Sequence, residues 1–199
     1  MTPPVILASA SVARRRLLER AGVAHDIIPS HIDERPIKDA CRQNAETVEI
    51  AVRRLAEAKA VTVSQQHPER LVIGADQMLE CDGRWFDKPA DRDGVRRHLT
   101  QLSGRSHVLV NATVVMAAGD VVWQHGDTIT MTMRRLSEAF IESYIEQAGA
   151  AACNAVGAYQ LEGAGGQLFE KTEGDFFSIL GLPLLPLMDF LRQRGVLPS

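Results

Sequence analysis

The sequence predicts a single domain of mixed α/β architecture, and three observations support this class. The chain has 199 residues, 45% of them hydrophobic, which is enough to bury a substantial core. Short apolar segments rich in β-branched residues alternate with segments whose apolar residues recur at helical spacing. No internal repeat, low-complexity tract or obvious linker interrupts this alternation. We therefore expect one domain over residues 1–199, organised as one or two lobes.

Apolar spacing defines the predicted elements of the N-terminal half. Leu17 and Leu18 lie on one face of a helix that Gly22 ends. Val52 and Leu55 belong to the apolar face of a longer amphipathic helix. The expected elements are, in order, a strand over 5–8, a helix over 12–21, a strand over 25–29, a polar loop over 31–44, a helix over 45–65 and an apolar strand over 71–79.

Turn and cap residues delimit the predicted elements of the C-terminal half. The pair Asp82-Gly83 is typical of a hairpin turn, and Gly119 lies in a short connection between two β-branched segments that we expect to pair antiparallel. Asp91 and Ser137 precede amphipathic segments as N-caps. The expected elements are, in order, a helix over 91–102, strands over 107–117 and 121–133, a helix over 137–147, a short strand over 167–171 and a helix over 184–194.

Charge and cysteine content exclude several classes of protein. The net charge of −3 argues against a protein whose main task is binding duplex DNA or RNA. Cys41, Cys81 and Cys153 lack the number and spacing of a disulfide framework or a zinc site, so we expect reduced thiols. The first residues lack a secretory signal, and the apolar stretch 179–191 is too short and too rich in proline to span a bilayer. These features predict a cytoplasmic protein.

The segment LASASVARRRLL places three arginines at the start of the first predicted helix. Cations are disfavoured there, because a helix N-terminus carries about half a positive elementary charge. An anion would reverse this, since the N–H groups of the turn and the guanidinium groups of Arg14, Arg15 and Arg16 would together bind phosphate oxygens. Alternatively, Ser11 caps the helix and the arginines are solvated or pair with acidic residues such as Glu19. This segment by itself leaves both interpretations open.

Single polar residues elsewhere are also candidates for phosphate chemistry. Asp76 lies in VIGADQ, at the far end of an apolar strand, where a carboxylate suits a metal ligand or a general base, although it is equally suited to capping the next turn. Lys88 precedes Pro89, which restricts its backbone to an extended conformation. Lys59 lies on the long predicted helix, where a solvated lysine is the more common outcome. His107 is more often a hydrogen-bonded structural residue than a catalyst.

Six segments together resemble one known family. LASASVARRRLL is similar to the LASxSPRRxxLL signature of the Maf, or septum-formation inhibitor-like, proteins. GADQ, DKP, LSGRSH, GAYQLEG and ILGLPL match that family in order and approximate spacing, so the resemblance spans Ile6 to about Arg192. It implies the Maf/inosine triphosphatase-like fold, a mixed twisted sheet with flanking helices and two lobes around a central cleft.

The resemblance implies a nucleoside triphosphate pyrophosphatase, which cleaves between the α and β phosphates and releases a nucleoside monophosphate and pyrophosphate. It also implies a divalent metal cation, Mg²⁺ or Mn²⁺, which needs few protein ligands because it keeps waters and binds substrate phosphates. Matching family positions make Asp76 the proton acceptor, and Asp76 with Glu34 the metal ligands. The positions that match the substrate-binding residues are Ser9, Arg14, Arg15, Lys59 and Lys88.

Three positions bear on the choice of nucleobase. Ala13 stands where the family signature usually has an arginine or an aromatic residue, so a face that would stack on a base is lost. Gln77 and Glu162 resemble the subfamily associated with 7-methyl-GTP, whereas the thymidine and uridine triphosphate subfamily usually has Thr and Gln there. A carboxylate at Glu162 would accept hydrogen bonds from a guanine edge and favour a cationic methylated base. The residues therefore favour 7-methyl-GTP.

Other functions stay open. The main alternative is a nucleotide-sensing regulator of cell division that binds in the same cleft without catalysis, and a nucleic-acid-binding protein agrees less well with the net charge. Asp76 and Lys88 favour catalysis, because a sensor has no need of a carboxylate that activates water. We expect a nucleoside triphosphate as the substrate, no stable nucleic-acid partner, no membrane association and, from the family resemblance, a homodimer.

Overall fold

A computed structural model describes residues 4–198, and strands alternate with helices along the chain as the sequence predicts. The strands are β1 Val5–Leu7, β2 His25–Ile27, β3 Val72–Cys81, β4 Arg84–Phe86, β5 Ser106–Ala117, β6 Asp120–Met133 and β7 Phe169–Glu173. The α-helices are α1 Val12–Arg20, α2 Arg35–Gln43, α3 Val48–Ser64, α4 Arg92–Leu102, α5 Glu138–Ala148, α6 Phe176–Ile179 and α7 Leu184–Gln193. Short 3₁₀ helices span Gly149–Asn154, Val156–Ala158 and Ala164–Leu168.

The strands form a seven-stranded mixed sheet in the order β2-β1-β3-β5-β6-β7, and β4 also pairs with β3. β1 is parallel to both of its neighbours, with Val5 opposite His25 and Ile6 opposite Val72. Parallel pairing requires crossover connections, which α1 and α3 provide. β4 and β7 pair antiparallel with β3 and β6. The predicted fold class, a mixed sheet with flanking helices, is confirmed.

The chain divides into two compact units. Unit 1 contains the residues up to Asp76, Asn111–Asp127 and the residues from Asp175 onward, and unit 2 contains Gln77–Val110 and Thr128–Gly174. The strands β3, β5 and β6 therefore each run from one unit into the other. The two units agree with the two lobes that the family resemblance implies, whereas the single domain and the central cleft stay predictions.

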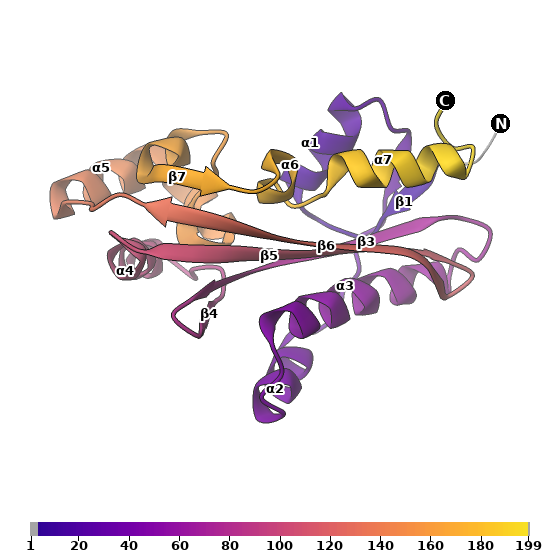
Figure 1. The fold of residues 1–199 in the computed structure, drawn as a ribbon, viewed down its shortest axis with the longest axis horizontal. Helices are drawn as coiled ribbons and strands as arrows, with labels where there is room; N and C mark the ends of the chain where they lie inside the picture. Colours follow the sequence, from indigo (N-terminus) through magenta and orange to yellow (C-terminus); the bar gives the residue numbers. More distant parts are fainter. Residues whose placement is uncertain (1–3, 199) are drawn as a thin grey trace. The chain divides into compact units, whose positions relative to one another are not determined.

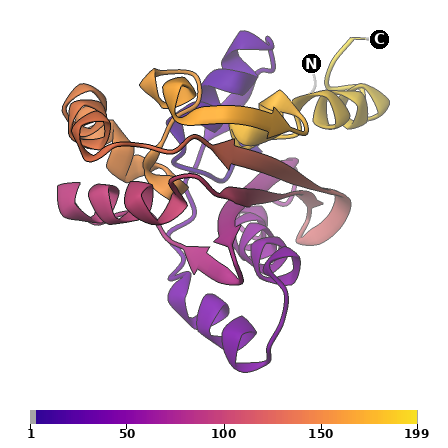
Figure 2. The same ribbon diagram turned by 60° about the vertical axis from the view of Figure 1, so that its left-hand side comes forward.

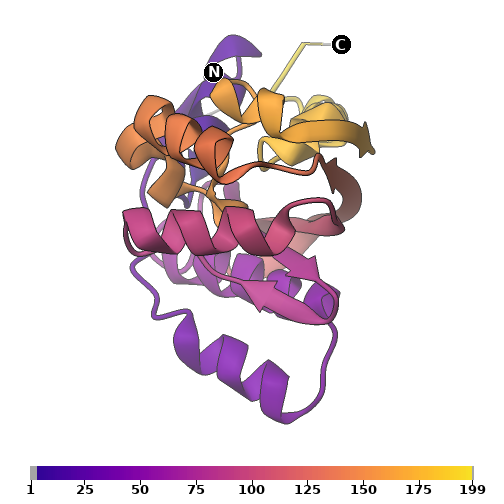
Figure 3. The same ribbon diagram turned by 90° about the vertical axis from the view of Figure 1, so that its left-hand side faces the viewer.

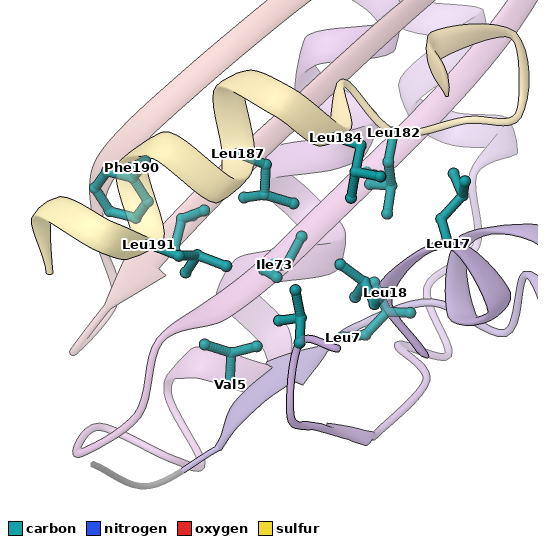
Figure 4. Packing of buried hydrophobic residues seen from close by; sticks show 13 residues of the cluster. Val5, Leu7, Leu17, Leu18, Ile73, Leu182, Leu184, Leu187, Phe190 and Leu191 are labelled. Atoms are coloured by element: carbon teal, nitrogen blue, oxygen red, sulfur yellow. The ribbon is translucent and has the colours of Figure 1, made fainter. Parts of the chain in front are cut away.

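A hydrophobic core covers one face of the strands in unit 1. Leu7 of β1 and Ile73 of β3 pack with Leu18 of α1 and with Leu187 and Leu191 of α7 (Figure 4). Burial of an aliphatic side chain of this size stabilises a fold by about 1.5–3 kcal/mol. These contacts therefore hold α1 and α7 on one face of the strands, while α3 lies on the opposite face (Figure 1).

Helix α3 reaches β3 at Gly74. A Cβ atom added to Gly74 would lie 2.4 Å from the carbonyl oxygen of Ala56 and 2.6 Å from the Cβ of Ala60, closer than nonbonded atoms approach. Glycine therefore lets the backbone of the helix contact the strand. Because side chains alternate along a strand, Asp76 lies on the same face as Gly74, and Ile73 faces the core on the other side.

In unit 2, α4 lies beside α5 (Figures 2 and 3). Arg96 of α4 donates to both carboxylate oxygens of Glu142 of α5, at 2.5 and 2.8 Å. His107 of β5 lies with its Nε2 atom 2.8 Å from the hydroxyl oxygen of Tyr159. Burial lowers the pKa of His107 to about 4, so the imidazole is neutral at pH 7. His107 is thus a buried, hydrogen-bonded residue, as the sequence favoured.

The predicted caps and turns are confirmed. Side-chain oxygens of Ser11, Asp91 and Ser137 each accept a hydrogen bond from the N–H group three residues further on, at 3.3, 2.7 and 3.2 Å. Asp82 and Gly83 have φ angles of 51° and 76°, the left-handed pair that a two-residue hairpin turn requires. The sequence predicts these features because each depends on residues that are close together in the chain.

One prediction of secondary structure is wrong. The segment 31–44, expected to be a polar loop, contains the helix α2. Pro36 stands in its first turn, where the missing N–H group is not needed. Cys41 is the buried residue of this helix, which packs against α3 (Figure 1). Ile37, Ala40 and Cys41 recur at helical spacing, but the many polar residues of the segment favoured a loop, and the contact with α3 stabilises the helix. The one-turn helix α6 was also not predicted.

Two further expectations concern the environment of the protein. Cys41 and Cys81 are buried and Cys153 is half-buried, and all three thiols are free. In the part of the chain that the structure describes, no helix combines the length and the apolar character needed to cross a membrane.

Candidate active site

The three consecutive arginines of α1 have different environments. Arg14 turns into unit 1 and is 8% exposed, whereas Arg15 and Arg16 are exposed. Arg15 forms an ion pair with Glu19, with Nε 3.3 Å from Oε1. Arg15 therefore agrees with the interpretation of a capped helix whose arginines are solvated or paired. The role of Arg15 in substrate binding stays a prediction. Arg14 shares the helix face of the buried Leu18, four residues further on.

Three acceptors hold the guanidinium group of Arg14. Its Nε donates to the carbonyl oxygen of Gly181 at 2.9 Å. Its Nη1 donates to the carbonyl oxygen of Ala75 at 2.7 Å and to the Oγ of Ser9 at 3.1 Å. Within residues 4–198, Nη2 donates no hydrogen bond, so its N–H groups can bind an anion. Asp76 lies in the middle of β3 and caps no turn, so its expected place at the end of the strand is wrong. Because Ala75 directly precedes Asp76, the same guanidinium group also fixes the part of the strand that carries this carboxylate.

Lys59 of α3 joins two carboxylates. Its Nζ donates to Oδ1 of Asp76 at 2.8 Å and lies 2.7 Å from Oε1 of Glu34. Lys38 of α2 contacts the other oxygen of Glu34, at 3.1 Å. Of the Lys59 and Asp76 side chains, 12% and 11% are exposed, so the expectation of a solvated surface lysine is wrong. Solvent still reaches the cluster, as a hydrolytic site requires.

Local sequence explains how these side chains meet. Asp76 lies two residues after Gly74 on the strand face that contacts α3. Lys59 lies directly before Ala60, whose backbone that glycine accommodates. The close approach of helix and strand therefore brings the lysine and the aspartate within hydrogen-bond distance.

The charges of the cluster influence one another. Burial raises the pKa of the Glu34 carboxyl group, but the ammonium groups of Lys59 and Lys38 outweigh this effect and lower its pKa to about 2. Burial lowers the pKa of Arg14, and the negative charges of Asp76 and Glu34 oppose that shift. An arginine keeps its charge at any pH at which proteins are stable. The site therefore holds cationic donors beside the ionised carboxylate of Glu34 at neutral pH.

Asp76 and Glu34 also fit a divalent cation. An oxygen of each carboxylate contacts the same lysine nitrogen, so the pair already surrounds one positive charge. Among residues 4–198, no group of three or more His, Cys, Asp or Glu side chains is arranged to hold a metal ion. Mg²⁺ and Mn²⁺ prefer oxygen ligands and complete their coordination with waters and substrate phosphates, so two carboxylates suffice.

Other predicted site residues lie elsewhere. Ala13 is half-buried on α1 of unit 1. The remaining three belong to unit 2, where Lys88 is exposed between β4 and α4, Gln77 is half-buried on β3, and Glu162 is exposed in the glycine-rich stretch before β7. Their roles in phosphate and base binding stay predictions.

Two partners of the site residues were not predicted. Lys38 was missed because its segment was expected to be a loop, although its spacing of four residues from Glu34 is typical of a helical ion pair. The carbonyl group of Gly181 was missed because backbone acceptors leave no mark in a sequence. Arg14 had a usable signal, since it lies three and four residues before the buried Leu17 and Leu18.

Comparison with known proteins gives consistent matches over nearly the whole chain. The family model described as Maf-like protein matches residues 4–194. A nucleoside triphosphate pyrophosphatase of Paramagnetospirillum magneticum is 52% identical over 96% of this chain and 99% of its own. Another, from Hyphomonas neptunium, is 50% identical over the full length of both chains. A 7-methyl-GTP pyrophosphatase of Mesorhizobium japonicum is 46% identical over 99% of each chain.

Proposed function

Because the chain belongs to the Maf family, we propose that it is a nucleoside triphosphate pyrophosphatase, a hydrolase acting on acid anhydrides. It cleaves the bond between the α and β phosphates and releases a nucleoside monophosphate and pyrophosphate. The observation that carries this proposal is the cluster of Arg14, Lys59, Asp76 and Glu34 in unit 1. It brings donors for phosphate oxygens beside carboxylates that can accept a proton from water.

The contacts support a division of roles among these residues. Nη2 of Arg14 and the hydroxyl group of Ser9 bind oxygens of the triphosphate, because both groups keep donors free. Lys59 holds one carboxylate oxygen of Asp76, which leaves Oδ2 without a hydrogen bond from the described residues. That oxygen takes the proton from the attacking water. Such a reaction depends chiefly on positioning and on charge stabilisation, which this arrangement supplies.

A divalent cation, Mg²⁺ or Mn²⁺, completes the proposed site. Asp76 and Glu34 would hold it, together with phosphate oxygens of the substrate. When bound, it would neutralise phosphate charge and make water easier to ionise. Lys59 contacts one oxygen of each carboxylate and so orients both toward the same point.

The direct test combines product identification with a substitution. Purified protein is incubated with a panel of nucleoside triphosphates and Mg²⁺ or Mn²⁺, and we expect pyrophosphate and a monophosphate as products. Asp76→Asn should lower kcat by about 10²- to 10⁴-fold, the usual contribution of a general base, with substrate binding largely kept. Asp189→Asn on the exposed surface of α7 is the matched control. Orthophosphate as the product, or full activity of Asp76→Asn, would contradict the proposal.

A modified guanine nucleotide is the proposed substrate. Gln77 and Glu162 support 7-methyl-GTP, and a relative named 7-methyl-GTP pyrophosphatase is 46% identical to this chain. Glu162→Gln should reduce the ratio of kcat/KM for 7-methyl-GTP to that for GTP, because the amide loses the charge that favours a cationic base. An unchanged ratio would remove Glu162 from base selection.

The remaining proposals concern the setting of the reaction. We propose a cytoplasmic enzyme, because three free cysteines are ordinary in a reducing compartment. We also propose a homodimer, on family resemblance, which light scattering in solution tests. Persistent nucleotide binding without product would favour the regulatory alternative, a sensor in cell division.

A further inference from the structure

The carbonyl group that holds Arg14 belongs to a turn that is itself fixed. Gly181 accepts the Nε–H of Arg14 at 2.9 Å and donates its own N–H to the carbonyl oxygen of Ser178 at 3.0 Å. Gly181 has a φ angle of 104°, in the left-handed region that favours glycine. A Cβ atom there would lie 3.0 Å from the Nε of Arg14. The turn therefore fits against the guanidinium group only in this backbone conformation.

Ser178, in α6, ties this turn to two strands of unit 1. The residue is fully buried. Its Oγ donates to Oδ2 of Asp127 on β6 at 2.5 Å, and its carbonyl oxygen accepts from Nδ2 of Asn111 on β5 at 2.5 Å. Its N–H donates to the N-cap residue Asp175 at 2.7 Å. The position of the Gly181 carbonyl group thus depends on side chains of β5 and β6.

Packing alone does not explain Asn111. The residue is 2% exposed, and its Oδ1 atom is buried without a hydrogen-bond partner in the structure of residues 4–198. An apolar side chain of similar size would bury no unpaired acceptor and would favour folding more. What this asparagine supplies is the N–H group that holds the Ser178 carbonyl group. Residues that break a general rule in this way are often tied to function.

We propose that Ser178, held by Asn111 and Asp127, is a positioning residue for the hydrolytic reaction. It fixes the Gly181 carbonyl group and thereby aims the guanidinium group of Arg14 at the substrate phosphates. Arg14 is bonded through Nη1 to Ala75, so its orientation also sets the distance from the bound phosphates to the neighbouring carboxylate. This inference rests on the proposed function.

The expected effect is on turnover more than on binding. Ser178→Ala removes the bond to Asp127 and leaves the charge of Arg14 in place, so phosphate is still attracted. A misplaced phosphate reacts slowly, and shifts of about 1 Å can cost up to 10²-fold in rate. We expect Ser178→Ala to lower kcat about tenfold, with KM changed by less than about twofold.

A double-mutant cycle with Arg14→Lys separates positioning from a structural role. Lysine keeps the charge but lacks the planar guanidinium group that donates to the carbonyl oxygens of Gly181 and Ala75. If Ser178 acts through Arg14, then Ser178→Ala lowers kcat about tenfold in the wild-type protein and by less than about twofold in Arg14→Lys. Equal losses in both backgrounds would overturn the proposal.

The matched control is Ser64→Ala. Ser64 is equally buried in unit 1, and its Oγ accepts a hydrogen bond from Gly119 N–H at 3.0 Å. We expect its kcat and KM to match those of the wild-type protein. If Ser178→Ala does not fold by circular dichroism, Asp127→Asn takes its place in the cycle, because it weakens the same hydrogen bond.

Titration of the same proteins with pyrophosphate distinguishes failure of this inference from failure of the proposed function. A wild-type protein that binds pyrophosphate but hydrolyses no triphosphate refutes the enzymatic proposal. The positioning role in turnover then falls with it. Where the wild-type protein does hydrolyse triphosphates, equal losses of kcat in both backgrounds overturn the positioning role alone. A wild-type protein that neither hydrolyses triphosphates nor binds pyrophosphate overturns both.

Discussion

Gly74→Ala is the substitution whose effect follows most directly from the contacts. The new Cβ would lie 2.4 Å from the Ala56 carbonyl oxygen, whereas ordinary contact begins at 3.4 Å. Because the blocking atoms belong to the helix backbone, α3 and β3 must separate by about 1 Å. Lys59 lies on this part of α3, so its hydrogen bond to Asp76, now 2.8 Å long, is also stretched.

The magnitude combines two opposing terms. Overpacking of this kind costs about 1–3 kcal/mol, and a clash with backbone belongs at the upper end. Alanine recovers about 0.4–1 kcal/mol by restricting the unfolded chain. The free energy of unfolding should therefore fall by about 2 kcal/mol, equivalent to a decrease in Tm of about 4–8 °C for a chain of this size. We also expect kcat to fall by about tenfold or more, since the carboxylate loses its orientation.

Urea denaturation and thermal unfolding followed by circular dichroism measure the first effect, and pyrophosphate release measures the second. Gly126→Ala is the control, because a Cβ at this strand glycine of unit 1 would meet the Asn111 carbonyl oxygen at an ordinary 3.5 Å. We expect this control to stay within about 0.5 kcal/mol of the wild-type stability. A Gly74→Ala protein as stable and active as the control would refute the argument for close contact between α3 and β3.

Three further predictions concern titration and metal binding. Lys59→Met should raise the pKa of Glu34 from about 2, which NMR titration measures. The ionised carboxylate stabilises the wild-type protein above about pH 4.5, and this stability is lost as the pH falls toward 2; in the variant the loss should begin at a higher pH. Buried His107, with a pKa of about 4 against 6.5 unfolded, should make the free energy of unfolding fall by about 3 kcal/mol between pH 6.5 and 4. In denaturation curves, His107→Gln should flatten this dependence, and an unchanged slope would contradict the assignment. Calorimetry should show Mn²⁺ binding at least about tenfold tighter with a non-hydrolysable triphosphate present, since the carboxylates Asp76 and Glu34 leave most ligands to waters and phosphates. Equal affinities would argue for a preformed metal site.

Elements with local signals were predictable from the sequence. The caps at Ser11, Asp91 and Ser137 and the hairpin turn at Asp82-Gly83 depend on hydrogen bonds and φ angles within four residues. Helix α2 was missed although Pro36 and the Glu34–Lys38 spacing are local helix signals, because most of its residues are polar and its stability depends on the contact with α3.

In the candidate site, too, some features follow from local sequence and others depend on tertiary contacts. The segments that carry Arg14, Lys59, Asp76 and Glu34 were identified from the sequence and the family they resemble. Their arrangement was not. The spacing of Arg14 from Leu17 and Leu18 places it on the buried face of α1, but the groups that hold it come from distant segments of the chain.

The sequence by itself determined the order of the strands and of the α-helices other than α2 and α6, and the chemical types available for phosphate hydrolysis. The tertiary structure decided which arginine is held at the site, which carboxylates share Lys59, and that Gly181 and Ser178 stand behind Arg14. The physical reason is the distance along the chain over which each interaction acts. Local signals act over a few residues, whereas the contact between Arg14 and Gly181 joins groups 167 residues apart and exists only once α1, β3 and the turn before α7 have packed together.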